Sequence, residues 1–181
     1  MAEPLSAEKA AEKARRIAET DFAEIVRRHQ AMVYSLALHF LADPAAAEEL
    51  AQDVFLQLHA NLGKLKSEDH VRFWLRKVTS HRCIDSKRRR MPPQMSLDEG
   101  PEPAVPSRTD DPLLSRRLRQ LVASLPEKPR MIVILRYQED MSAEDIAEVL
   151  AMPVATVKSH LQRSLALLRE KVTRTIGEVT I

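Results

Sequence analysis

Glycine and aromatic residues are scarce in this chain of 181 residues, which has 3 glycines against 11 prolines and only 4% aromatic residues. Sheets favour β-branched and aromatic side chains, whereas a chain poor in glycine and stopped by a few prolines suits helices. The composition therefore predicts an all-α protein. Because hydrophobic residues make up 44% of the chain but few are aromatic, its cores must be aliphatic.

Cysteine is also nearly absent, since Cys83 is the only one. A single cysteine excludes an internal disulfide, and the Cys/His cluster of a zinc site is missing. Cys83 is predicted to be a buried structural thiol. No segment is long and apolar enough to span a membrane, and the charged start of the chain lacks the apolar centre of a secretory signal. We therefore expect a cytoplasmic protein without membrane insertion.

Charge is unevenly distributed along the chain, whose net charge is +2. Residues 1–92 carry 16 basic and 13 acidic side chains, residues 93–111 carry 1 and 5, and residues 112–181 carry 11 and 8. Two mildly basic parts therefore flank an acidic segment that is rich in proline and serine. Such a composition is typical of an extended linker. The sequence predicts two small helical domains joined by a flexible linker.

The segment from Ser142 to Arg169 has the pattern of a helix-turn-helix. A short helix with an apolar face is followed by a tight connection at Met152 and Pro153, and then by a longer basic helix with apolar residues at helical spacing. An ordinary helical hairpin with a solvated polar face is the alternative. Between the apolar positions of the second helix lie side chains that can hydrogen-bond to phosphates or base edges, namely Thr156, Lys158, Ser159, Gln162 and Arg163.

Three helices are predicted before the acidic segment. Asp43 and Pro44 open the middle one, as an N-cap and a proline at the first helical position. The others cover about residues 22–41 and 71–90, and the polar stretch 61–70 is predicted to be a loop.

The last of these helices ends in a basic run next to Phe73 and Trp74. Basic groups neutralise phosphates, so we expect nucleic-acid contact there, with a merely solvated face as the alternative. Trp74 itself is predicted to belong to the core.

Three segments, in this order, resemble the conserved regions of extracytoplasmic-function sigma factors of RNA polymerase. They read DPAAAEELAQDVFLQLHANL, FWLRKVTSHRCIDSKRRR and LPEKPRMIVILRYQEDMSAEDIAEVLAMPVATVKSHLQRSL. The resemblance implies a region 2-like domain at 22–91, a linker at 92–111 and a region 4-like helix-turn-helix domain at 112–175. Residues 1–21 would be an extension, which their composition predicts to be a helix with little apolar face.

The resemblance also implies what the protein does. Such a chain is not an enzyme and needs no cofactor or metal. It binds core RNA polymerase and directs initiation by opening the −10 promoter element and recognising the −35 element, and an anti-sigma factor commonly holds it inactive.

The resemblance assigns roles to three groups of residues. The candidates for polymerase binding are Gln52, Asp53, Leu56 and Gln57. Those for the −10 element are Asn61, Lys64, Lys66, Arg76, Lys77, His81, Arg82, Lys87, Arg88, Arg89 and Arg90. Those for the −35 element are Thr156, Lys158, Ser159, His160, Gln162 and Arg163.

The chain departs from the family pattern at three positions. His81 stands where Asn is common, His160 where Arg is common, and Ala155 where Gly is usual. A neutral histidine has one donor and lacks the fork of arginine, so we expect base readout to differ at the two histidines.

Two other functions stay open at this point. The second domain also resembles the helix-turn-helix of LuxR-type regulators, which bind DNA without being polymerase subunits. The first domain argues against this, because it lacks the strand pattern of a receiver domain. An enzyme is the other alternative, but the sequence has no Gly-rich phosphate loop, metal cluster or nucleophile-base pair.

Overall fold

A computed structural model describes the backbone of residues 4–65, 67–90 and 112–176, and the side chains of residues 22–65, 67–86 and 117–174. Within these ranges the chain is all-α, as predicted, with no strand. The first domain consists of α1 (Pro4–Leu41), α2 (Pro44–Asn61), a 3₁₀ turn (Leu62–Lys64) and α3 (Glu68–Arg90). The second consists of α4 (Pro112–Ala123), α5 (Glu127–Tyr137), α6 (Ala143–Leu150) and α7 (Val154–Ile176). The acidic segment lies outside the described residues.

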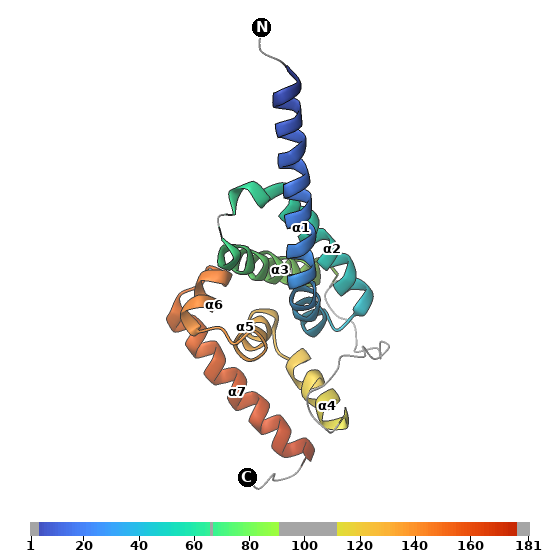
Figure 1. Cartoon of the computed structure of the whole chain (residues 1–181). Helices are drawn as coiled ribbons and strands as arrows, with labels where there is room; N and C mark the ends of the chain where they lie inside the picture. Colours follow the sequence, from blue (N-terminus) through green and yellow to red (C-terminus); the bar gives the residue numbers. More distant parts are fainter. Residues whose placement is uncertain (1–3, 66, 91–111, 177–181) are drawn as a thin grey trace.

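The helix α1 is continuous from Pro4, so the predicted N-terminal extension and the predicted first helix form one element. Its first half projects beyond the other helices, while α4 and α7 lie at the opposite end of the molecule (Figure 1). Between these ends, α3 lies across the fold and meets α5 and α6. The two domains therefore pack against each other through α1 and α3 on one side and α5 and α6 on the other.

One apolar core extends through both domains. Its fully buried members include Leu36 and Phe40 from α1, Leu58 from α2, Leu75 from α3, and Met131, Ile132, Leu135, Ile146 and Val157 from the second domain. Leu50, Val54 and Leu58 of α2 face this core. Cys83 is also fully buried, as predicted, and burial raises the pKa of its thiol.

The predicted loop at residues 61–70 is wrong at both ends. Asn61 is the last residue of α2, residues 62–64 form the 3₁₀ turn, and α3 already begins at Glu68. The early start has a local cause, because the Ser67 hydroxyl accepts a hydrogen bond from the His70 amide at 3.1 Å. Glu68 and Asp69 then lie in the first turn of α3, where negative charge is favourable.

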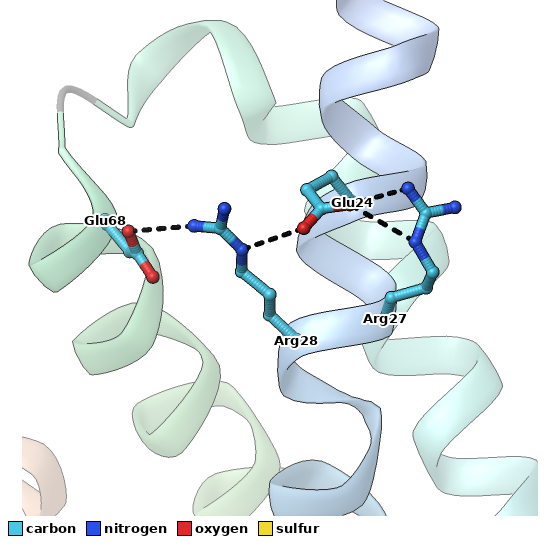
Figure 2. A network of polar contacts seen from close by, with 4 residues as sticks. All are labelled: Glu24, Arg27, Arg28 and Glu68. Carbon is cyan, nitrogen blue, oxygen red and sulfur yellow. Dashed lines mark hydrogen bonds and ion pairs between the residues drawn. The ribbon is translucent and has the colours of Figure 1, made fainter.

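Charged side chains connect α1 to the start of α3 on the surface. Arg28 lies between Glu24 of α1, at 3.0 Å, and Glu68 of α3, at 3.1 Å, and Arg27 binds the other side of Glu24 (Figure 2). These hydrogen bonds lower the pKa of Glu24. All four side chains are exposed, so the network contributes little to stability and mainly orients the two helices.

The helix-turn-helix is formed by α6 and α7. The Ser142 hydroxyl accepts from the Asp145 amide at 3.0 Å while the Asp145 carboxylate accepts from the Ser142 amide at 3.2 Å, so a complete capping box starts α6. Ala151 ends α6 in the left-handed conformation, with φ of 51°. The turn that follows points the polar side of α7 away from the core residues Val157 and Leu168.

Candidate nucleic-acid interface

The outer face of α2 holds the side chains predicted to bind polymerase. Gln52, Asp53 and Leu56 are exposed, and Leu56 is 70% exposed although it is apolar. Gln57 is half-buried. The opposite face of α2 is buried, because the Asp43 N-cap, which accepts from the Ala46 amide at 3.1 Å, starts the helix in the register that turns Leu50, Val54 and Leu58 inward.

An open groove of about 1040 Å³ lies between α2 and α3. Asp53 and Gln57 line one wall, and Lys77, His81 and Arg82 line the other together with Trp74. The structure thus brings predicted polymerase residues and predicted −10 residues together along one groove. Trp74 is half-buried, so it belongs to the core only in part and presents the rest of its ring to this groove.

Arg82 joins the two walls of the groove. Its guanidinium donates to the Gln57 side-chain oxygen at 3.1 Å and to the Asp53 carboxylate at 2.9 Å. The Arg82 and Asp53 side chains are both well exposed, so their ion pair contributes little to stability. Arg82 can therefore exchange Asp53 for a phosphate at small cost.

Two other predicted −10 residues on α3 bind the second domain. Arg76 donates to the Glu139 carboxylate at 3.0 Å and to the Glu139 carbonyl at 3.2 Å. The His81 ring Nε2 lies 2.9 Å from the Val149 carbonyl, to which it donates. Both partners come from more than 60 positions further along the chain, and no sequence signal pointed to them.

The remaining predicted −10 residues are dispersed. Asn61 is the last residue of α2, and the ammonium of Lys64 in the 3₁₀ turn donates to the Asn61 side-chain oxygen at 3.2 Å, whereas Lys77 is exposed on α3. Lys66 lies outside the described residues, as do the side chains of Lys87, Arg88, Arg89 and Arg90, whose backbone continues α3.

The predicted −35 residues share the outward side of the first turns of α7. Lys158, Gln162 and Arg163 are exposed, and Thr156, Ser159 and His160 are half-buried. Lys158 pairs with Glu144 of α6 at 2.9 Å, and this hydrogen bond lowers the pKa of Glu144. Glu144 was not among the predicted residues, because the contact depends on how α6 meets α7 and not on spacing within one helix.

Buried polar groups in the described residues include Arg130, another residue that the sequence did not single out. It is 4% exposed, its Nη1 donates to the Phe40 carbonyl at 2.9 Å, and its guanidinium lies 5.5 Å from the centre of the Phe40 ring. Burial lowers the pKa of Arg130.

In the described part of the chain, no group of three His, Cys, Asp or Glu side chains suits a metal ion. No helix there has the length and apolarity needed to cross a membrane.

Comparison with protein families identifies the class of this chain. Residues 25–91 match the model described as Sigma-70 region 2, and residues 115–168 match the one described as Sigma-70, region 4. The chain belongs to the sigma-70 family and, within it, to the extracytoplasmic-function sigma factors. Such a factor is not an enzyme; it binds core RNA polymerase and directs transcription initiation at specific promoters. The match to region 2 excludes the LuxR-type alternative.

Individual relatives align with this chain over most of their length. The ECF RNA polymerase sigma factor SigW of Bacillus subtilis is 28% identical over 169 residues, which covers 83% of this chain and 88% of SigW. The RNA polymerase sigma-E factor of Streptomyces avermitilis is 29% identical over 152 residues, covering 84% of this chain and 85% of that protein.

Two solved structures have the same fold. The sigma factor RpoE of Bartonella quintana, crystallised with the anti-sigma factor NepR, superposes with a TM-score of 0.66 at 19% identity and covers 83% of this chain and 95% of that one. CnrH, in complex with the cytosolic domain of CnrY, gives a TM-score of 0.64 at 18% identity and covers 87% and 90%.

Proposed function

We propose that the exposed face of α2 is the surface with which this sigma factor binds core polymerase, through Gln52, Asp53, Leu56 and Gln57. The observation that carries this assignment is the 70% exposure of Leu56 among polar neighbours on a helix whose other face is buried. Burying a leucine side chain at an interface contributes about 1.5–3 kcal/mol. The polar neighbours supply orientation and specificity.

The −10 element binds beside this surface, along α3 and the turn before it. Lys77, His81 and Arg82 supply donors on one side of the groove, Arg76 supplies them from the side of α3 that faces the second domain, and Asn61, Lys64 and Lys66 supply them from the end of α2 and the residues after it. The basic run from Lys87 to Arg90 adds phosphate contacts. Opening the duplex costs a few kcal/mol for each unstacked base, and contacts to the extruded base and to phosphates offset this cost.

The −35 element binds the first turns of α7. Thr156 lies near the helix N-terminus and contacts a phosphate, while Lys158, Ser159, His160, Gln162 and Arg163 face the major groove. The exposure of Lys158, Gln162 and Arg163 supports this assignment, since their donors are accessible without any rearrangement of the fold.

An anti-sigma factor is the partner that we propose to keep this protein inactive, because RpoE, which shares its fold, was crystallised with one. Core polymerase and promoter DNA are cytoplasmic in bacteria, so we place the protein in the cytoplasm.

Substitution of Leu56 tests the polymerase surface. Leu56→Ala should weaken binding of the full chain to core polymerase by about 1.5–3 kcal/mol, measured by fluorescence anisotropy. Leu167→Ala is a matched control, because Leu167 is 47% exposed on α7 in the other domain. Equal affinities of the two variants for core polymerase would contradict the assignment.

A further inference from the structure

The interface between the two domains covers part of the proposed −10 surface. The Arg76 guanidinium is held by the carboxylate and the carbonyl of Glu139, and the Glu139 side chain is only 7% exposed. A carboxylate accepts from arginine in the same planar geometry as a phosphate does. Glu139 therefore occupies Arg76 in the way that a phosphate of the −10 element would.

The second covered residue is His81. The Nε2–H of His81 donates to the Val149 carbonyl near the end of α6. In this arrangement that nitrogen is not available to a base edge. Arg76 and His81, two proposed −10 residues on α3, are thus both hydrogen-bonded to the second domain.

Further contacts hold the domains together without involving DNA residues. Arg130 of α5 donates to the carbonyl of Phe40 in the last turn of α1 and lies against the Phe40 ring. Gln138 donates to the Ser35 hydroxyl at 2.9 Å. These contacts and the shared apolar core act together with the Arg76 and His81 bonds to hold the packed arrangement, so loss of one of them shifts the balance toward the open arrangement.

Promoter geometry requires this arrangement to open. The −10 and −35 elements are about 25 base pairs apart, which is roughly 85 Å of B-form DNA at 3.4 Å per base pair. In the packed arrangement a 2.9 Å hydrogen bond joins α3 to α6. The two proposed DNA-binding surfaces are then too close together to bind the −10 and −35 promoter elements at the same time.

We propose that the second domain of the free protein masks its own −10 surface, with Glu139 and the Val149 carbonyl taking the places of DNA acceptors at Arg76 and His81. This inference rests on the proposed −10 role of these two residues. Masking and DNA binding then compete for the same groups. Any change that weakens the packed arrangement must strengthen −10 binding by the free protein, by reciprocal linkage.

Glu139→Gln is the variant that tests this competition. It keeps the shape of the side chain, removes the charge that holds Arg76, and leaves every proposed DNA residue unchanged. Glu170→Gln is the control: it makes the same charge change in the same domain, but Glu170 pairs with Arg174 on α7. The probe is single-stranded DNA with the non-template −10 sequence of one of the protein's own promoters, mapped from its transcription start sites.

We expect Glu139→Gln to bind this DNA about tenfold more tightly than the wild type, and Glu170→Gln to match the wild type apart from a small effect of net charge. Adding Arg76→Ala to Glu139→Gln should remove the gain. Unchanged affinity in Glu139→Gln would overturn the masking proposal.

A second measurement distinguishes a failure of the masking proposal from a failure of the proposed −10 role of Arg76. Energy transfer between dyes on Ala60→Cys in α2 and Ala166→Cys in α7, both exposed positions, reports whether the domains are packed, and buried Cys83 stays unlabelled. We expect the dye separation to increase in Glu139→Gln without DNA. If it does, but adding Arg76→Ala to Glu139→Gln leaves DNA affinity unchanged, the −10 role of Arg76 is wrong and masking falls with it. Equal separation in both proteins would overturn masking directly.

Discussion

The two proposed DNA-binding surfaces of this sigma factor differ in how accessible they are. On α7, Lys158, Gln162 and Arg163 project from the fold, and Lys158 pairs with the exposed Glu144. On α3, Arg76 and His81 are bound by groups of the other domain. On this account, one chain presents its proposed −35 surface in the free state and keeps part of its proposed −10 surface covered.

The largest effect that we expect on the accessible surface comes from Arg163→Ala. If Arg163 reads a base, this change should weaken binding of the free protein to −35 duplex DNA by about 1–3 kcal/mol. Arg76→Ala should leave the same duplex affinity almost unchanged. A gel-shift or anisotropy titration at fixed salt measures both.

If Arg163→Ala and Arg76→Ala weakened −35 binding equally, the distinction between an accessible and a covered surface would fail. If neither did, Arg163 would not belong to the −35 readout.

A smaller effect is expected on the pH dependence of the unfolding free energy, where a buried histidine of the first domain should differ from an exposed one. His29 is 5% exposed, and its Nε2 has no hydrogen-bond partner in the described part of the chain. Burial, followed by the charge of Arg72, lowers its pKa. The folded protein therefore holds His29 neutral at a pH where the unfolded chain already protonates it, below about pH 6.5. His29 thus favours folding above that pH, and this contribution is lost as the pH falls toward the folded pKa.

His29→Gln should consequently reduce the loss of unfolding free energy between about pH 7 and pH 5. Urea denaturation across this range measures the effect, with His59→Gln, at an exposed position of α2, as the control. A pH dependence identical to that of the wild type would show that His29 is not the acid-sensitive group.

The smallest effect concerns Glu144. Its carboxylate holds the Lys158 ammonium in the free protein, so Glu144→Gln should release Lys158 and tighten −35 duplex binding by about twofold. Because Lys158 carries this effect, Glu144→Gln should change little in a Lys158→Ala background. A gain that persisted in that background would assign it to net charge alone.

Local patterns predicted the elements of this fold well. Asp43 with Pro44, and Ser142 with its apolar repeat, predicted where α2 and α6 begin, because caps and periodicity act within a few residues. The outward side of α7 followed from the spacing of its apolar residues. These signals depend only on neighbours in sequence.

Contacts between distant segments were not predictable. Arg130 reads as a charged residue at the start of an apolar run, and its acceptor, the Phe40 carbonyl, lies 90 positions earlier in the chain. Glu139 reads as a surface residue in a turn, yet its side chain is buried against Arg76. The early start of α3 was missed for a different reason, since Ser67 and Glu68 were counted as loop residues on polarity alone.

The separation of the two domains, followed while core polymerase is added, tests the central claim most directly. With dyes on Ala60→Cys and Ala166→Cys, the free protein should show high energy transfer, and saturating core polymerase should lower it as the domains separate toward the spacing of about 85 Å between the two promoter elements. Low energy transfer in the free protein, unchanged when polymerase binds, would contradict a packed free state and with it the difference between the two surfaces.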